Sequence, residues 1–278
     1  MNEQRRPDVL APASGDNAPA FAELRAGNLG VRLATCKEEV RAAQALRYQV
    51  FYQEMGALAD AETLALELDR DQYDEVADHL LVVDHDLGEG VENVVGTYRL
   101  IREGAAEKIG CFYSESEYDI SALKHASSRK LELGRSCTAK AYRNRMVMQL
   151  LWRGIAAYIF HYNIDIMFGC ASLSGTDPDA LAEELAYLAL HHNAPAEIRP
   201  KALPERYVDM LRLPPETIDP KRALMRLPPL IKGYLRLGGF VGDGAVIDSQ
   251  FNTTDIAIIV KTDLVTEKYY RHYERDTR

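Results

Sequence analysis

The sequence predicts an α/β fold in which helices flank a single sheet. Three observations support this class: short apolar runs of strand length alternate with amphipathic segments of helical spacing, no internal repeat divides the chain, and apolar residues form 47% of its 278 residues. A chain of this size and composition can bury a substantial core. We therefore expect one folded domain over residues 29–278.

Residues 1–28 differ from the rest in composition. They are rich in Ala, Pro and polar residues and contain no apolar core of a signal peptide. Such a segment buries too little apolar surface to fold alone, so we expect a disordered leader. No run in the chain approaches the ~18 apolar residues of a membrane-spanning helix, which predicts a cytoplasmic protein.

The first half of the folded part predicts strands and a helix around a polar loop, because apolar runs of strand length stand on both sides of it. The expected elements are, in order, a strand at 30–36, a helix at 38–56 that stops at Gly56, an irregular polar segment at 57–77, a hairpin of strands at 78–85 and 93–101, and the end of a strand followed by a helix start at 111–126.

The second half predicts further strands and helices around an insertion rich in Pro and Arg, which we expect to be helical. The expected elements are a strand at 130–138, a helix at 145–162, a buried strand at 164–173, a helix at 176–192 capped by Thr176 or Asp177, the insertion at 194–236, tight turns around Gly238, Gly239, Gly242 and Gly244, a strand at 255–262 and a last helix at 263–275.

Charge and cysteine content limit the classes of partner. A net charge of −9 argues against general nucleic-acid binding, so an acidic partner would need a local basic patch. The four cysteines form no C-x-x-C pair and lie in or beside apolar runs, which predicts reduced thiols. The seven histidines show no metal-ligand spacing, so we expect no metal site.

The strand at 130–138 carries the first candidate for chemistry. Glu132 alternates with Leu131 and Leu133, so its carboxylate lies on the opposite face from the two leucines. Arg135 shares the leucines' face if the strand is regular, and a bulge would change that. Either Glu132 and Arg135 form a structural ion pair, or Glu132 is a general base that removes a proton from an attacking amine.

The start of the helix at 145–162 is the second candidate. Arg143, Asn144 and Arg145 stand at a helix N-terminus, where free backbone N–H groups favour an anion. Cations are unfavourable at this end of a helix dipole, which favours a bound anion as the reason for the arginines. No Gly-rich phosphate loop is present. A strand carboxylate beside an anion site suggests group transfer from a phosphate-bearing donor.

The acidic residues allow two interpretations. The polar segment and its edge are either a solvated loop or a pocket for a cationic group, and Asp248 near the last strand is a further pocket candidate. The acidic cluster comprises Asp69, Asp71, Asp74, Glu75 and Asp78.

Several ordered motifs resemble a known family. They are LRYQVFYQEMGAL, DRDQYDEVADHLLVVD, VVGTYRLI, LELGRSCTAKAYRNR and PPLIKGYLRLGGFVGDGAVIDSQFNTTDIAIIV, and the similarity that they indicate covers about residues 30–272. These motifs resemble the ornithine lipid biosynthesis N-acyltransferases of the GNAT superfamily, a family similar to the acyl-homoserine-lactone synthases. The resemblance implies a GNAT-like acyltransferase fold with a mixed, mostly antiparallel sheet, in a single acyltransferase domain.

The resemblance also implies a reaction. A 3-hydroxyacyl chain would pass from acyl carrier protein to the α-amine of L-ornithine, giving lyso-ornithine lipid. The donor would be the phosphopantetheine arm of the carrier protein, with no tightly bound cofactor and no nucleic acid. The insertion at 194–236 could touch the inner membrane peripherally. The alternatives are an acyl-homoserine-lactone synthase-like acyltransferase and a non-catalytic GNAT-fold binding module.

Site roles follow from the same resemblance. Positions 141–146 lack the glycines of the GNAT pyrophosphate loop, which favours the single phosphate of phosphopantetheine over the diphosphate of coenzyme A. The implied assignments are Glu132 and Arg135 for catalysis; Arg47 and Phe51 on the first helix; Asp71, Asp74 or Asp248 for the ornithine side-chain ammonium; Arg99 or Arg135 for its carboxylate; Ser136, Cys137, Thr138, Arg143, Asn144 and Arg145 for the phosphopantetheine and the oxyanion; and Lys140 and Arg153 for the carrier protein.

Overall fold

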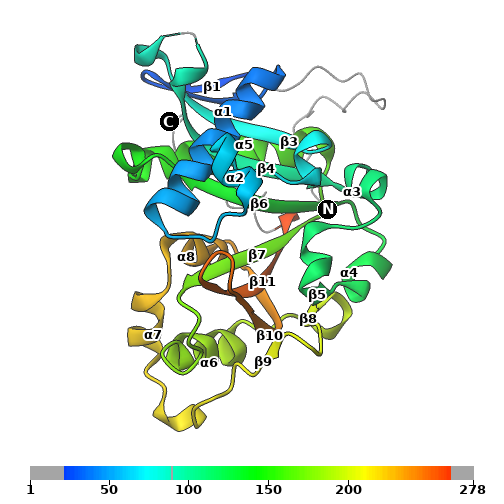
Figure 1. Cartoon of the computed structure of the whole chain (residues 1–278). Helices are drawn as coiled ribbons and strands as arrows, with labels where there is room; N and C mark the ends of the chain where they lie inside the picture. The colour runs from blue at the N-terminus through cyan, green and yellow to red at the C-terminus, as the bar shows by residue number, and fades with distance from the viewer. Residues whose placement is uncertain (1–21, 89, 264–278) are drawn as a thin grey trace, which may run out of the picture.

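A twisted mixed sheet runs through the computed structural model, which describes residues 22–88 and 90–263 (Figure 1). Its order is β1-β2-β3-β4-β6-β7-β11-β10-β8-β5, with β9 beside β10. Neighbours are antiparallel except β6 with β7 and β8 with β10. The strands are β1 (Leu24–Ala26), β2 (Leu29–Leu33), β3 (Asp78–Asp84), β4 (Val94–Arg102), β5 (Tyr118–Asp119), β6 (Lys130–Thr138), β7 (Ile166–Ser174), β8 (Lys201–Ala202), β9 (Tyr207–Val208), β10 (Phe240–Asp248) and β11 (Thr253–Lys261).

Helices cover both faces of the sheet. On one face, α5 packs against β2 and β3, and α6 to α8 cover the other half; on the opposite face, α1 packs against β3 and β4 (Figure 1). The α-helices are α1 (Lys37–Tyr48), α2 (Ala61–Leu66), α3 (Glu103–Ile109), α4 (Ser121–His125), α5 (Arg145–Tyr162), α6 (Ala182–His191), α7 (Pro220–Arg226) and α8 (Pro229–Arg236). No helix of the described residues is long and apolar enough to cross a membrane.

The strands β6 and β7 separate in the middle of the sheet. They pair in parallel over three positions only, ending at Glu132 opposite Phe168. The next residue of β7, Gly169, still lies close to β6, because an added Cβ there would stand 2.2 Å from the backbone oxygen of Leu133. Figure 1 shows the two strands diverging from there. Beyond the paired positions, the facing backbone groups of β6 and β7 form no β-ladder with each other.

A β-bulge interrupts β6 just after Glu132. Thr97 pairs with Cys137 and Arg99 with Gly134, so Arg135 and Ser136 together oppose the single residue Tyr98. Arg135 has a φ of 51°, in the left-handed region. The bulge therefore turns Arg135 to the face that carries Glu132, away from the leucines' face that a regular strand would give it.

Most predicted elements are confirmed. The hairpin of β3 and β4, the strand β6 and the helix α5 all form, and the predicted first helix continues from α1 into a π-helical turn over Gln49–Glu54. The insertion at 194–236 is helical in its second half, through α7 and α8, and contains the short strands β8 and β9 in its first half.

Five expectations need correction. The predicted disordered leader, residues 1–28, is too long, because the strand β1 lies within it. The polar segment 57–77 contains α2 and a 3-10 turn over Gln72–Glu75. The segment 111–126 forms a 3-10 turn, β5 and α4 rather than a strand end and one helix. The strand β10 occupies the stretch assigned to glycine turns. The helix α6 begins at Ala182, because Asp177 accepts a hydrogen bond from the Asp179 N–H in a local turn and caps no helix. Residues 1–21 and most of the predicted last helix lie outside the described residues.

Candidate active site

A buried network of arginines and aspartates stands beside the bulge. Its members are Arg47 on α1, Arg99 on β4, Arg135 on β6, and Asp69, Asp71 and Asp74 from the loop before β3. Arg47 donates two hydrogen bonds to the Asp74 carboxylate, at 2.9 and 2.7 Å, and its Nε lies 2.7 Å from Asp69. Three positive charges thus meet three negative charges, which is the arrangement that makes buried ions tolerable.

Asp74 and Arg99 are engaged inside this network. The two oxygens of Asp74 accept bonds from Arg47, Arg99, Gln44 and the Asp71 N–H. Burial alone would raise the pKa of Asp74, but the guanidinium groups of Arg47 and Arg99 outweigh it and hold the pKa well below its usual range. These residues therefore position the loop, and the expected roles of Asp74 as an ammonium ligand and of Arg99 as a carboxylate ligand do not fit the geometry.

Arg135 and Asp71 lie at the outer side of the network. Asp71 is partly exposed and accepts bonds from Arg99 at 2.6 Å and Arg135 at 3.3 Å. The Arg135 guanidinium sits between the rings of Tyr113 and Phe251, 4.8 and 4.9 Å from their centroids. Its bonds to Asp69 and Asp71 use Nε and Nη2. The guanidinium also has a side-chain hydrogen bond with Tyr113.

Glu132 is buried and makes no ion pair with Arg135, so the structural pair considered from the spacing does not form. Its two oxygens accept hydrogen bonds from the N–H groups of Tyr113, at 2.8 Å, and Ser114, at 2.7 Å, and from the Ser114 hydroxyl. Burial raises the pKa of Glu132, and these hydrogen bonds offset part of that effect. Any contact between Glu132 and a substrate would therefore pass through the Ser114 hydroxyl.

Three further carboxyl groups gather on the same face of the sheet. They belong to Glu117 before β5, Asp248 at the end of β10 and Asp255 on β11, and one oxygen of each lies within 4.8 Å of the others. Burial and the charge of Asp255 raise the pKa of Glu117 to about 7. Burial also raises the pKa of Asp255. Oxygen ligands of this kind suit a hard cation or an ammonium group.

Sequence reasoning found only one member of this carboxyl cluster. Asp248 was a candidate, but Glu117 and Asp255 were not assigned to a site. Asp255 does leave a signal, since it is a charged residue at the start of the apolar run DIAIIV. Glu117 leaves none, because it stands in the polar stretch YSESEYD among other acids. The cluster forms through pairing of strands that the sequence alone does not specify.

Cys170 connects the two carboxyl sites. Its thiol lies 3.5 Å from the Ser114 hydroxyl, which bonds to Glu132. Burial and the charges of Glu117 and Asp255 raise the pKa of the thiol well above its usual range. Cys170 therefore remains a neutral thiol, placed between the Ser114 hydroxyl and the Glu117 carboxyl group.

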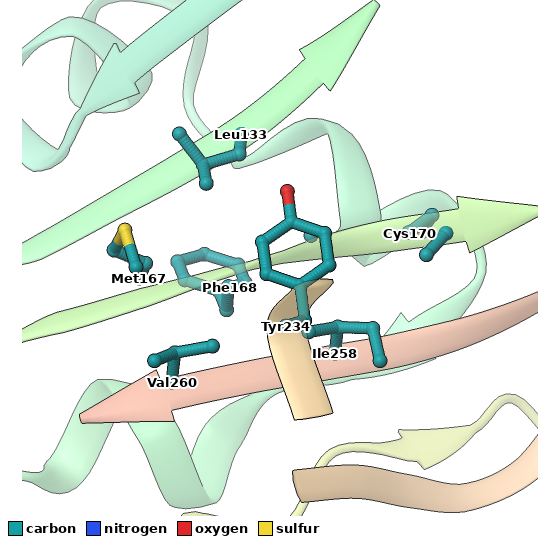
Figure 2. A pocket seen from close by; sticks show the side chains of 9 residues that line it. Leu133, Met167, Phe168, Cys170, Tyr234, Ile258 and Val260 are labelled. Atoms are coloured by element: carbon teal, nitrogen blue, oxygen red, sulfur yellow. The ribbon is translucent and has the colours of Figure 1, made fainter. Parts of the chain in front are cut away.

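An apolar pocket lies where β6 and β7 separate. Figure 2 shows Tyr234 of α8 reaching toward Leu133 of β6 through this gap. The Tyr234 hydroxyl is hydrogen-bonded to that of Tyr98. The pocket is lined by Leu133, Met167, Phe168, Gly169, Cys170, Ala171, Tyr234, Ile258 and Val260. Its free volume of about 10 Å³ has room for about one water molecule, so a larger group would have to displace the side chains that line it.

The residues expected around the phosphopantetheine occupy different environments. Asn144 caps α5 by accepting the Val147 N–H at 3.1 Å. Arg143 is tied to Glu54 at 2.6 Å and to the Thr138 carbonyl at 3.0 Å. Lys140 and Arg145 are exposed beside the α5 N-terminus, whereas Arg153 lies further along the helix and is half-buried.

The strand residues of the same expected set divide between the two faces of β6. Ser136 lies on the face of Tyr98, and Thr138 pairs with Gly96. Cys137 is buried against α1, and burial raises the pKa of its thiol to about 12. The Cys137 side chain therefore points away from the pocket between β6 and β7.

Comparison with known proteins places these features in a family. The model of the acetyltransferase (GNAT) domain matches residues 46–153, and together with the following relatives it identifies the protein as an N-acyltransferase. An L-ornithine N(alpha)-acyltransferase of Rhizobium meliloti (strain 1021) is 45% identical over 99% of this chain and 92% of its own length. Another, of Brucella abortus (strain 2308), is 45% identical over 92% of each chain. The chain belongs to the L-ornithine N(alpha)-acyltransferase family.

Solved structures are more distant. The AHL synthase LasI is similar over 84% of this chain and 89% of that chain, at 14% identity and a TM-score of 0.44. A score this low does not by itself establish a common fold.

Proposed function

We propose that this N-acyltransferase transfers a 3-hydroxyacyl chain from acyl carrier protein to the α-amine of L-ornithine, forming lyso-ornithine lipid. Membership of a family whose relatives are named for ornithine supports the acceptor. The observation that carries the chemistry is the separation of β6 and β7 beside Ser114 and Glu132. A thioester entering that gap meets a proton acceptor on one face of the sheet.

The donor enters the gap between the strands. Beyond Glu132 and Phe168, the facing backbone groups of β6 and β7 are free to bond an extended arm that carries amides of its own, as a peptide adds to a sheet edge. The thioester end lies beside Tyr234 once the side chains that line the small apolar pocket have moved aside. The phosphate lies at the N-terminus of α5, near Lys140 and Arg145. One phosphate and a peptide-like arm are the features of phosphopantetheine.

The reaction is direct attack by the amine. The α-nitrogen of ornithine bonds to the thioester carbon, the C–S bond breaks, and the sulfur leaves on the phosphopantetheine arm and takes up the proton that the amine has lost. The Ser114 hydroxyl takes the proton from the amine while passing its own to Glu132, whose pKa is raised by burial. The raised pKa values of Cys137 and Cys170 keep both thiols neutral, so neither acts as an acyl-carrying nucleophile.

Substrate orientation and charge stabilisation come from the strand after the bulge. The guanidinium of Arg135 holds the α-carboxylate of ornithine, because a guanidinium suits a carboxylate partner. Backbone N–H groups around Ser136–Thr138 donate to the oxygen of the tetrahedral intermediate. One such donor contributes about 10²-fold or more in rate.

The insertion supplies a peripheral contact with the inner membrane, where the product is released. Large apolar side chains are exposed on it, namely Leu211, Leu213, Leu224 and Met225. Apolar residues of this kind can enter the interfacial region of a bilayer. Sedimentation with anionic lipid vesicles, compared with a variant that carries Ser at Leu224 and Met225, tests this contact.

The deciding experiment uses purified enzyme with a 3-hydroxyacyl carrier protein and L-ornithine. Mass spectrometry should detect N-acylornithine, and the free thiol of the carrier protein should appear in equal amount. Fragmentation should place the acyl group on the α-nitrogen. An acyl lactone formed from a homoserine-containing acceptor, or no turnover with any amino acid, would contradict the proposal. Replacing the carrier protein with acyl-coenzyme A tests the donor separately.

A further inference from the structure

The carboxyl groups of Glu117, Asp248 and Asp255 form a close cluster of three buried acids. Its members come from three segments that the fold joins: the chain before β5, the end of β10 and the start of β11. Asp255 lies on β11 opposite Val246 of β10, and Asp248 is two residues further along that strand, so the two aspartates share one face. Three carboxyl oxygens within 4.8 Å of each other repel unless a proton or a cation lies between them.

Two of these carboxyl groups carry an oxygen without a partner. Glu117 is 2% exposed and Asp255 6%, yet Glu117 Oε2 and Asp255 Oδ1 accept no hydrogen bond from the described residues. The nearest guanidinium, that of Arg206, stands 3.8 Å from the other oxygen of Glu117. Asp248 uses Oδ1 alone for its bonds to the Gln250 and Phe251 N–H groups. A buried unpaired acceptor is unfavourable, and a donor brought by a ligand removes that penalty.

The position of the cluster relates it to the acyl-transfer site. Cys170 lies between the Glu117 carboxyl group and the Ser114 hydroxyl, and it also lines the pocket between β6 and β7. The cluster and the proton acceptor are therefore neighbours on one face of the sheet. A short molecule with an amine at each end can reach both.

We propose that Glu117, Asp248 and Asp255 bind the side-chain ammonium of the amino-acid acceptor while its α-amine is acylated, an inference that rests on the proposed function. The ammonium has three N–H donors, and the cluster offers three carboxyl oxygens. Its charge also compensates a site that has three acids and one arginine, Arg206, at 3.8 Å from Glu117. Asp248 keeps the role expected from the sequence, and the two buried acids complete it.

This subsite determines which amine reacts. Ornithine has two amines, and each can attack a thioester once it has lost a proton. Bonding to three carboxyl groups keeps the side-chain nitrogen charged and therefore without a lone pair for attack. The same contact holds the α-amine toward the gap between β6 and β7. Acceptors without a side-chain cation should bind poorly.

The test compares L-ornithine with L-norvaline, which has the same carbon chain and α-amine but no side-chain amine. Wild-type enzyme should prefer ornithine in kcat/KM by about 100-fold or more. In Asp255→Asn and, separately, Glu117→Gln, kcat/KM for ornithine should fall about 10- to 100-fold while that for norvaline changes much less, because a hydrogen bond to a charged group contributes that range. Asp243→Asn is the matched control, because it removes a carboxylate of β10 that is not part of the cluster. It should change neither value.

The ratio of kcat/KM for ornithine to kcat/KM for norvaline distinguishes the ammonium subsite from its alternatives. Equal losses toward ornithine and norvaline would assign the acids to proton transfer or folding and overturn the subsite. A wild-type enzyme that uses both acceptors equally well would also overturn it while leaving the acyl transfer intact. Activity abolished by chelation and restored by Mg²⁺ or Ca²⁺ would assign the cluster to a metal instead. An enzyme that acylates neither acceptor would refute the proposed function itself. Norvaline turnover reports on folding in each variant.

Discussion

Replacing Glu117 with Gln should stabilise the free enzyme at alkaline pH. Burial and Asp255 raise the pKa of Glu117 from its ordinary 4.5 to about 7 in the folded protein. The folded state therefore holds this proton more tightly than the unfolded state does, and wild-type stability from this group is present below pH 4.5 and is lost as pH rises toward 7. Each pKa unit corresponds to ~1.4 kcal/mol, so the full loss is about 3 kcal/mol. Glutamine keeps the shape of the side chain and cannot ionise.

The assay is urea unfolding of wild type and Glu117→Gln at several pH values between 5 and 8.5. The difference in free energy of unfolding should grow with pH in favour of the variant and level off above pH 7. Glu205→Gln, which changes an exposed acid, should follow the wild type throughout. A Glu117→Gln curve parallel to the wild-type curve at all pH values would refute the idea that this carboxyl group is buried without compensation. Saturating ornithine should reduce the difference, because a bound ammonium favours the ionised form.

Three other variants test the remaining parts of the site. Ser114→Ala removes the proposed relay hydroxyl but keeps the backbone bond to Glu132, so kcat should fall about 10²-fold with little change in KM, and an unchanged kcat would exclude the relay. Asp74→Asn leaves the buried Arg47 poorly paired and should lower the free energy of unfolding by about 3–5 kcal/mol; a loss below 1 kcal/mol would show that the network is not structural. Lys140→Glu with Arg145→Glu should raise the KM for acyl carrier protein but not for ornithine, an effect that weakens at high salt, and equal KM values would place the carrier protein elsewhere.

Local signals predicted the elements that local interactions form. The helix α5 was expected at 145–162 and forms at Arg145–Tyr162. Its cap, Asn144, and its apolar stripe both lie within one continuous segment of the sequence, so a local pattern is enough to predict it. The strand β10 was missed because Gly242 and Gly244 predict turns. In the structure Gly242 lies close to the backbone of Pro200, and Gly244 has a φ of 84°, at the point where the register with β11 shifts. Glycine is needed at these two positions because of the neighbouring strands, and the sequence alone does not show which strands are neighbours.

The site was predictable as a set of residue types but not as a set of contacts. The spacing of Glu132 and Arg135 marked the correct strand, and the acidic loop was recognised as a cluster. The bulge that brings Arg135 to the face of Glu132 depends on the pairing of β6 with Tyr98, which is 37 positions from Arg135 along the chain. Without the bulge, the two side chains would lie on opposite faces. Pairing between distant strands therefore decides which acid each arginine meets.

The two charged clusters on this face of the sheet differ in a way that indicates their roles. The aspartates at 69, 71 and 74 are matched by three arginines and bond them in the unliganded protein. The acids at 117, 248 and 255 have no such match, since the bulge directs Arg135 toward Asp69 and Asp71. A fold that neutralises one buried cluster completely and leaves its neighbour short of positive charge has a preformed place for a cation. For an enzyme that acylates one end of a diamine-bearing amino acid, the other amine supplies that cation.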